Sequence, residues 1–414
     1  MRGLRIRPPE RHTASQAVWL RRGLMLSGMV VLLLVVATNR VAGQEGDLQA
    51  QSAATYTFGQ NMQFSLRAKS ADEINGATLF FNTPEMTNTY AVELELEPAR
   101  EIALEHELPL TQVQLAPFTT VHYWWRLTTE SGTLMVDEKT LAYVDDRFMW
   151  QELAREGVDV HWTGQESTLG QVALDVIDGV RPQLQAVFPG EIEPLDVYIY
   201  PSMADLRSAL RLTGRDWLGG EAMPELGVLL VTSVNPRTAA FDLGQSIPHE
   251  LSHLLIYRRL GAQYGNVPRW FDEGLATSLE MAQDVSYEAL LTEAVAQEAT
   301  IPLEQLCAAF PEGDAEVRLA YAQSASVVKF IRQSYGMRAL RDLVDAYADG
   351  AACGSGVQRV LGETIDELEY SWLAGEKPVS PFVRFLRLNG LWVTLAGAGF
   401  LIMGLLLIPM RKQR

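Results

Sequence analysis

Hydrophobic and polar residues alternate with a period of two between about residues 55 and 144. Residues 121–127, VHYWWRL, place Val, Tyr, Trp and Leu at every second position, and residues 61–68, NMQFSLRA, do the same with Met, Phe and Leu. Such alternation is typical of strands that bury one face. Turn-forming residues interrupt the runs, as in SADEING at 70–76. The pattern predicts an all-β, antiparallel sandwich over residues 50–146.

A helical period replaces the alternation further along the chain. Two short apolar runs, LDVYIYP at 195–201 and ELGVLLVTS at 225–233, predict strands, and helical patterns dominate from there to Trp372. We therefore predict an α+β domain over residues 147–375.

Two segments of the chain are not typical of globular structure. Residues 1–43 contain an arginine pair, a short apolar run and a Val-Ala-Gly site, which predict a secretory signal peptide or, if it is not removed, a signal anchor. Residues 390–410 carry no charge and are long enough to span a bilayer as a transmembrane helix. A linker at 376–389 precedes this segment, and the basic residues of 411–414 favour a cytoplasmic tail. The bulk of the chain is then expected outside the cytoplasm, tethered to the cell membrane.

Composition narrows the classes of partner. The 414 residues carry a formal net charge of −17, which argues against nucleic acid as a partner because phosphates require clustered Lys and Arg. A lipid bilayer is the partner that the uncharged segment at 390–410 favours. The only two cysteines, Cys307 and Cys353, could pair in an oxidising compartment or remain two separate buried thiols.

A single helix is predicted over residues 246–261, SIPHELSHLLIYRRLG. Ser246 suits the N-cap, Pro248 the first turn and Gly261 the end of this helix. The helix is not embedded in a long apolar segment, and two arginines follow the histidines. An intramembrane protease, which also uses His-Glu-x-x-His, is therefore excluded.

The His-Glu-Leu-Ser-His motif in this helix has the spacing of a metal site. His249 and His253 are four residues apart, so they lie one turn apart on one face, where two imidazoles can bind one zinc ion. Glu250 is rotated by about 100° from His249. It can therefore act on the attacking water without binding the metal itself.

A third ligand must come from elsewhere, because a catalytic zinc ion takes three protein ligands. The remaining histidines lie far upstream, so a carboxylate has to complete the site. Glu273 follows His253 by 20 positions, within VPRWFDEGLATSLE at 267–280. Asp272 is the alternative ligand. The small residues Gly274 and Ala276 would let two helices approach closely.

The two motifs together resemble the gluzincin metallopeptidases. His-Glu-x-x-His followed by Trp-x-x-Glu-Gly-x-Ala is similar to the clan of thermolysin and aminopeptidase N, and most similar to the bacterial peptidase MA-like family. The resemblance covers residues 148–375. It implies a zincin-like (thermolysin-like) fold, zinc ligands His249, His253 and Glu273, and Glu250 as general base.

The resemblance also indicates further site residues. Thermolysin-like enzymes have an Asp four residues after the ligand Glu, but this chain has Thr277, and Glu280 is the candidate to accept a hydrogen bond from a ligand histidine. Tyr321 resembles the oxyanion-stabilising Tyr of the family, and a core aromatic is the alternative. The free edge of strand 225–233 could pair with an extended peptide, with Gly219 and Gly220 leaving room for its backbone.

Two functions follow as expectations. One is a membrane-anchored, extracytoplasmic zinc metallopeptidase with one catalytic Zn²⁺. The other is a cell-surface binding or adhesion protein that uses the β-sandwich, which resembles immunoglobulin and fibronectin type III domains, and keeps the peptidase-like domain as an inactive scaffold. The intact Glu250 favours the enzyme, because a scaffold has no chemical need for a general base.

Overall fold

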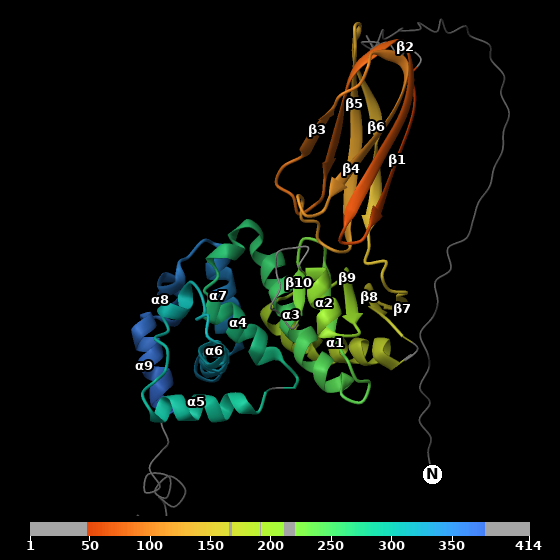
Figure 1. Cartoon of the computed structure of the whole chain (residues 1–414). Coiled ribbons are helices and arrows are strands. Elements are labelled where there is room, and N and C mark those ends of the chain that lie inside the picture. The colour runs from red at the N-terminus through yellow and green to blue at the C-terminus, as the bar shows by residue number, and fades with distance from the viewer. Residues whose placement is uncertain (1–47, 165–167, 191, 211–219, 283, 377–414) are drawn as a thin grey trace, which may run out of the picture. The chain divides into compact units, whose positions relative to one another are not determined.

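The computed structural model describes most of the chain between the two apolar segments (Figure 1). The described residues are 48–164, 168–190, 192–210, 220–282 and 284–376. Among them, no helix combines the length and the apolar character needed to cross a membrane. The segments predicted as signal, membrane span and tail, and nearly all of the predicted linker, lie outside the described residues.

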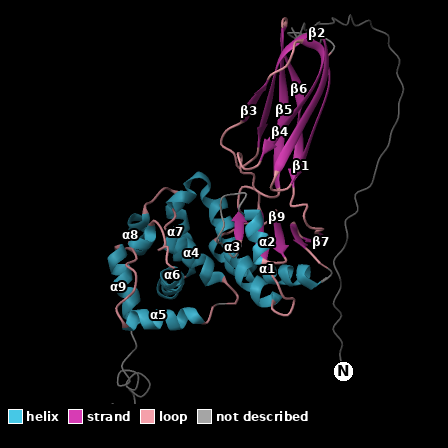
Figure 2. Ribbon diagram, viewed as in Figure 1, coloured by secondary structure: helices cyan, strands magenta, loops and turns pink. Residues whose placement is uncertain are grey.

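Strands make up the N-terminal part and helices most of the C-terminal part (Figure 2). The N-terminal part is β-sandwich-like, with six antiparallel strands. They are β1 (Gln49–Thr57), β2 (Asn61–Asn82), β3 (Tyr90–Leu94), β4 (Ala99–Pro109), β5 (Thr119–Thr129) and β6 (Gly132–Tyr143).

The long strand β2 belongs to both halves of this sandwich. Its beginning pairs with β1 and β4, whereas its end pairs with β3 and β5, and the register shifts between Lys69 and Ile74. The turn predicted at residues 70–76 is therefore wrong, because the strand runs on through an irregularity at which Asp72, Glu73 and Asn75 are exposed. Phe64 from the first half meets Phe81 from the second at 5.7 Å between ring centroids, so the halves share one core.

The C-terminal part begins with a five-stranded mixed sheet in the order β10-β11-β9-β8-β7. The three central strands are parallel, and the two edge strands run antiparallel to their neighbours. The bounds are β7 (Gln151–Arg155), β8 (Val158–Trp162), β9 (Leu195–Tyr200), β10 (Glu221–Met223) and β11 (Val228–Thr232). The strand predicted at 225–233 is thus not the free edge, because the short hairpin partner β10 covers that side.

Nine α-helices of the described residues surround or follow this sheet. They are α1 (Thr168–Val187), α2 (Met203–Leu210), α3 (Ala239–Leu260), α4 (Arg269–Leu279), α5 (Ser286–Ala296), α6 (Asp314–Tyr335), α7 (Met337–Ala348), α8 (Cys353–Leu361) and α9 (Ile365–Glu376), with short 3₁₀ turns η2 (Gly261–Asn266) and η3 (Gln305–Cys307). Leu251 and Leu254 of α3 are fully buried in the large core that the sheet and the helices share.

Helix α3 begins earlier than its sequence signals indicate. It starts at Ala239, so Ser246 and Pro248 lie inside the helix and not at its N-terminus. A proline inside a helix leaves the carbonyl four residues before it without its usual donor. Here the Gly244 carbonyl accepts a hydrogen bond from the Met281 N–H at 2.8 Å. The carbonyl that Pro248 leaves free thus binds the chain just after α4 to the middle of α3.

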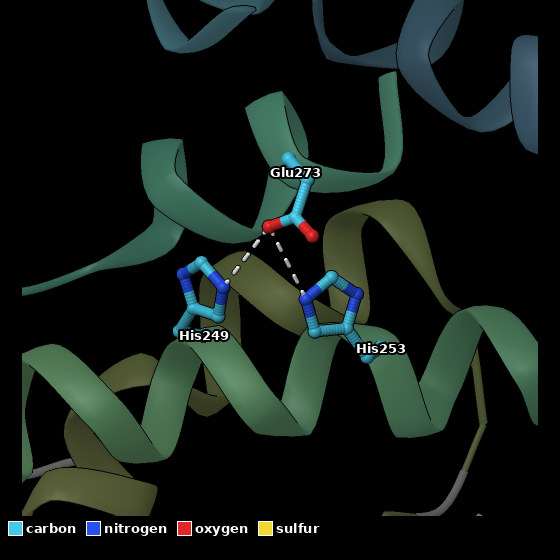
Figure 3. Close-up of side chains that lie close together, drawn as sticks. All are labelled: His249, His253 and Glu273. Carbon is cyan, nitrogen blue, oxygen red and sulfur yellow. Dashed lines mark ion pairs between the residues drawn. The ribbon is translucent and has the colours of Figure 1, made fainter. Parts of the chain in front are cut away.

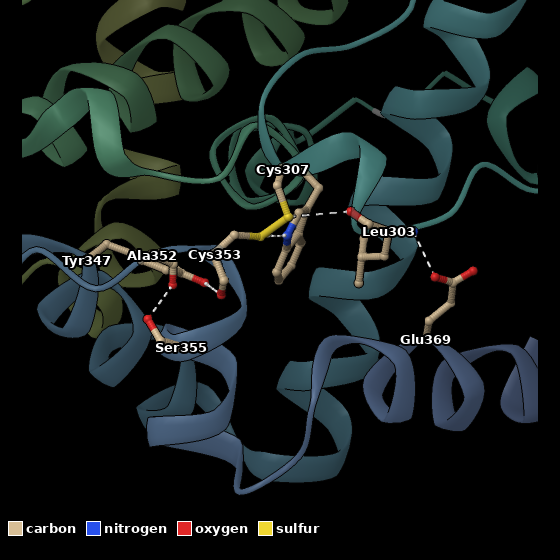
Figure 4. The surroundings of a disulfide bond; sticks show 8 residues. Leu303, Cys307, Tyr347, Ala352, Cys353, Ser355 and Glu369 are labelled. Carbon is tan, nitrogen blue, oxygen red and sulfur yellow. Dashed lines mark hydrogen bonds between the residues drawn. A yellow bond between two sulfur atoms is a disulfide. The ribbon is translucent and has the colours of Figure 1, made fainter.

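Two contacts fix α4 from its other sides. A Cβ on Gly274 would lie 2.5 Å from the Ser324 carbonyl oxygen, so glycine allows α4 to approach α6 closely. The structure joins Cys307 and Cys353 in a disulfide with an S–S distance of 2.04 Å (Figure 4). The Trp270 indole N–H donates to Cys353 Sγ at 3.4 Å. Helix α4 is therefore held on several sides at once.

Candidate metal centre

Three side chains from two consecutive helices point toward one another (Figure 3). His249 and His253 rise from α3, and Glu273 comes from the first turns of α4. Glu273 Oε2 lies 3.3 Å from His249 Nε2 and 3.6 Å from His253 Nε2. Tetrahedral ligands about 2.0–2.1 Å from a zinc ion are about 3.3 Å apart. The spacing of these atoms therefore fits a single zinc ion.

Each imidazole is oriented by a carboxylate on its far side. His249 Nδ1 lies 2.9 Å from Glu280 Oε1, and His253 Nδ1 lies 2.8 Å from Asp272 Oδ1. Both carboxylates are nearly buried, so these contacts are shielded from water. An Nδ1–H that donates to a carboxylate leaves the Nε2 lone pair free for a metal.

The three facing atoms form a site that a cation or a proton between them would stabilise. Glu273 is 2% exposed, and its Oε2 is a buried acceptor that no hydrogen bond reaches. Two imidazole lone pairs converge on the same point. A buried carboxylate oxygen that accepts no hydrogen bond costs free energy unless a cation or a proton compensates it. The donor set of two nitrogens and one oxygen is a common one for catalytic zinc.

The pKa values of the two histidines in the metal-free site also indicate that positive charge is stabilised there. Burial lowers the pKa of His249, but the carboxylates of Glu273 and Glu280 outweigh burial and raise it to about 9. Burial also opposes protonation of His253, yet Asp272 and Glu273 hold its pKa well above the usual value. Protons on the imidazoles and a divalent cation therefore compete for the same place.

Glu250 lies beside the triad and not in it. It is 9% exposed, and burial raises the pKa of its carboxyl group although the two histidines lower it. A Cβ on Gly220 would come within 2.7 Å of Glu250 Oε1. The glycine expected to leave room for a substrate backbone is thus in contact with the candidate base. Gly219 lies outside the described residues.

The triad opens into a cleft with two arms. Cavities of about 380 and 540 Å³ share His249, Glu250 and Tyr321 in their walls. Tyr321, on α6, has its ring centroid 6.3 Å from that of His249. Burial raises the pKa of its hydroxyl, which keeps the O–H available as a donor. The edge strand β10 lines the smaller cavity through Glu221 and Ala222.

Sequence reasoning missed two residues of this site. Asp272 was weighed only as a ligand, but its carboxylate faces His253 Nδ1 and also accepts from the Tyr264 hydroxyl at 3.1 Å. Arg269 was not singled out, although its guanidinium lies 2.6 Å from Glu273 Oε1. Their positions in the sequence could have identified them, since both residues are within one helical turn of Glu273.

The triad forms a candidate metal site, and comparison with known proteins indicates a family for the segment that carries it. The family model of the Peptidase MA superfamily matches residues 185–376, which include both helices of the site. The match supports a peptidase MA-like family for this segment of the chain.

Two solved structures are similar over a smaller part. One is wild-type OgpA from Akkermansia muciniphila, at 10% identity and a TM-score of 0.21, with 26% of this chain and 31% of that chain covered. The other is catalytically inactive OgpA in complex with an O-glycopeptide substrate, at 9% identity and a TM-score of 0.20, with 26% and 32% covered. The matched segment spans about a third of the length of those chains. No match to a curated protein is found.

Proposed function

We propose that this protein is a zinc-dependent peptidase that hydrolyses peptide bonds of a peptide or protein substrate. The observation that carries the proposal is the convergence of His249 Nε2, His253 Nε2 and the unpartnered Glu273 Oε2 on one point. The match of residues 185–376 to the family model of the Peptidase MA superfamily supports it.

Glu250, Tyr321 and the metal site have separate roles in the proposed hydrolysis. A bound zinc ion supplies Lewis-acid polarisation of the scissile carbonyl and acidification of the attacking water. Glu250 accepts the proton of that water and delivers it to the leaving amine. Its raised pKa, which burial causes, suits a group that must both take up and release a proton near neutral pH. Tyr321 is placed to donate its O–H to the developing oxyanion.

We also propose an extracytoplasmic, membrane-tethered location. The apolar run within residues 1–43 and the uncharged segment 390–410 motivate it. The disulfide between Cys307 and Cys353 supports it, because structural disulfides persist in oxidising compartments. The sandwich then serves as a spacer or binding platform of immunoglobulin or fibronectin type III type.

The decisive test uses the full-length protein purified in detergent. We expect about one zinc ion per chain and cleavage of denatured casein or a peptide library. Glu250→Gln should keep the zinc and lower kcat by roughly 10²–10⁴-fold, since it removes the general base. Glu293→Gln, an exposed residue on α5, is the matched control and should behave as wild type.

Two outcomes would contradict the proposal. A wild-type protein that binds no zinc would favour the adhesion alternative with an inactive scaffold. Equal activity of Glu250→Gln and wild type would remove the assigned base and leave the cleavage without its mechanism.

A further inference from the structure

Arg269 is a positively charged residue at the wall of the metal site. It is the first residue of α4, and its guanidinium lies 2.6 Å from Glu273 Oε1 and 3.6 Å from Asp272 Oδ2. Among the described residues that line the two cavities of the cleft, no other Lys or Arg occurs. Three carboxylates surround the triad, namely Glu250, Asp272 and Glu280, and Glu273 within the triad is a fourth.

In both Glu273 and Asp272, the two carboxylate oxygens contact different groups. Glu273 turns Oε2 toward both imidazoles and Oε1 toward Arg269. Asp272 turns Oδ1 toward His253 Nδ1 and Oδ2 toward Tyr264 and Arg269. One guanidinium therefore contacts both a candidate ligand and the carboxylate that orients another ligand. The planar fork of Arg can serve two carboxylates at once, which a Lys ammonium does less well.

The position of Arg269 at the start of α4 does not favour the stability of this helix. A positive charge in the first turn opposes the helix dipole, and an acid four residues after the base is the less favourable order for a helical ion pair. Arg269 and Glu273 have both features, as the first residue of α4 and its i+4 partner. Helix stability alone therefore does not account for an arginine at this position.

We propose that Arg269 is a positioning residue for the metal centre: it holds Glu273 Oε1 so that Oε2 alone faces the ion. Single-oxygen ligation leaves a coordination position open, which a catalytic zinc site requires. The inference rests on the proposed zinc site and concerns only how the chain shapes it.

The test measures zinc binding by full-length protein in competition with a chelating dye, without reference to activity. Arg269→Met should weaken zinc binding about 10- to 100-fold, the range typical when an outer contact of a ligand is lost. Arg269→Lys should recover part of that loss because it keeps the charge. In cobalt(II)-loaded protein, Arg269→Met should weaken the visible absorption bands, because the freed Oε1 can also bind and raise the coordination number.

The matched control is Arg259→Met, which removes an arginine of α3 that pairs with Asp345 at 2.6 Å. The two Met variants should have similar melting temperatures without metal, and only Arg269→Met should lose affinity. Unchanged zinc affinity in Arg269→Met would overturn the proposal, as would a loss of affinity matched by a much lower metal-free melting temperature. Wild-type protein that binds no zinc would instead defeat the proposed function, and this inference with it.

Discussion

The sandwich and the helix pair α3–α4 bury polar residues in different ways. Within residues 49–143, all of which the structure describes, the buried polar side chains are hydroxyls: Ser52, Ser70, Thr78, Thr83, Thr119 and Thr129. The helix pair instead buries three carboxylates, on Glu250, Asp272 and Glu273. Buried charge is costly unless it is paired or binds a metal. The difference separates a region built for stability from one built for chemistry.

The largest expected effect tests the stability side of this comparison. Trp125→Ala removes a fully buried ring from the sandwich core and should lower the free energy of unfolding by about 3–5 kcal/mol, measured by urea denaturation. Zinc affinity should not change. Trp124→Ala, on the opposite face of the same strand and stacked on Phe80, is the matched control and should cost less. Weakened zinc binding in Trp125→Ala would break the separation of the two regions.

A second prediction concerns the chemical side. In Gly220→Ala the new Cβ meets the flexible end of Glu250, so the carboxylate should rotate away at little cost in stability. Misplacement of a catalytic group by about 1 Å can lower a rate by about 10²-fold, and we expect a fall of that order in kcat with zinc affinity unchanged.

The control for this substitution is Gly354→Ala on α8, where an added Cβ meets no atom within 4 Å. Both variants should unfold at nearly the same temperature as wild type. A Gly220→Ala protein with full activity would show that Glu250 need not occupy its present place.

The smallest expected effect is a pH dependence of the metal-free protein. The pKa of His249 is raised from its ordinary 6.5 to about 9 in the fold, so its protonated form adds stability that is complete below pH 6.5 and is lost as the pH rises through 9. The melting temperature of the metal-free protein should therefore fall between pH 6.5 and 9.5.

His249→Asn should reduce this pH dependence, because the titrating group is removed. Zinc should shift the balance in the other direction, since it binds the neutral imidazole and its affinity should rise with pH over the same interval. A melting temperature in His249→Asn that falls as steeply as in wild type would assign the effect to other groups.

Local sequence patterns predicted many residues of the site but not how helices α3 and α4 pack against each other. The spacing of His249 and His253 follows from the helical period, and Glu273 was reached through a family motif. The position of α3's first residue was missed, because Pro248 is ordinarily a sign of a helix start. Its lost hydrogen bond is replaced only in three dimensions, by Met281 N–H on Gly244 O.

The sequence by itself determined which side chains could bind a metal, that two of them share a helical face, and that strands precede helices along the chain. The tertiary structure alone decided which ligand histidine Glu280 faces, that Asp272 faces His253 and that Arg269 holds the other oxygen of Glu273. The reason is physical. A helical period fixes angles within one helix, whereas a contact between helices depends on the packing of α3, α4 and α6 and on the close approach that Gly274 allows.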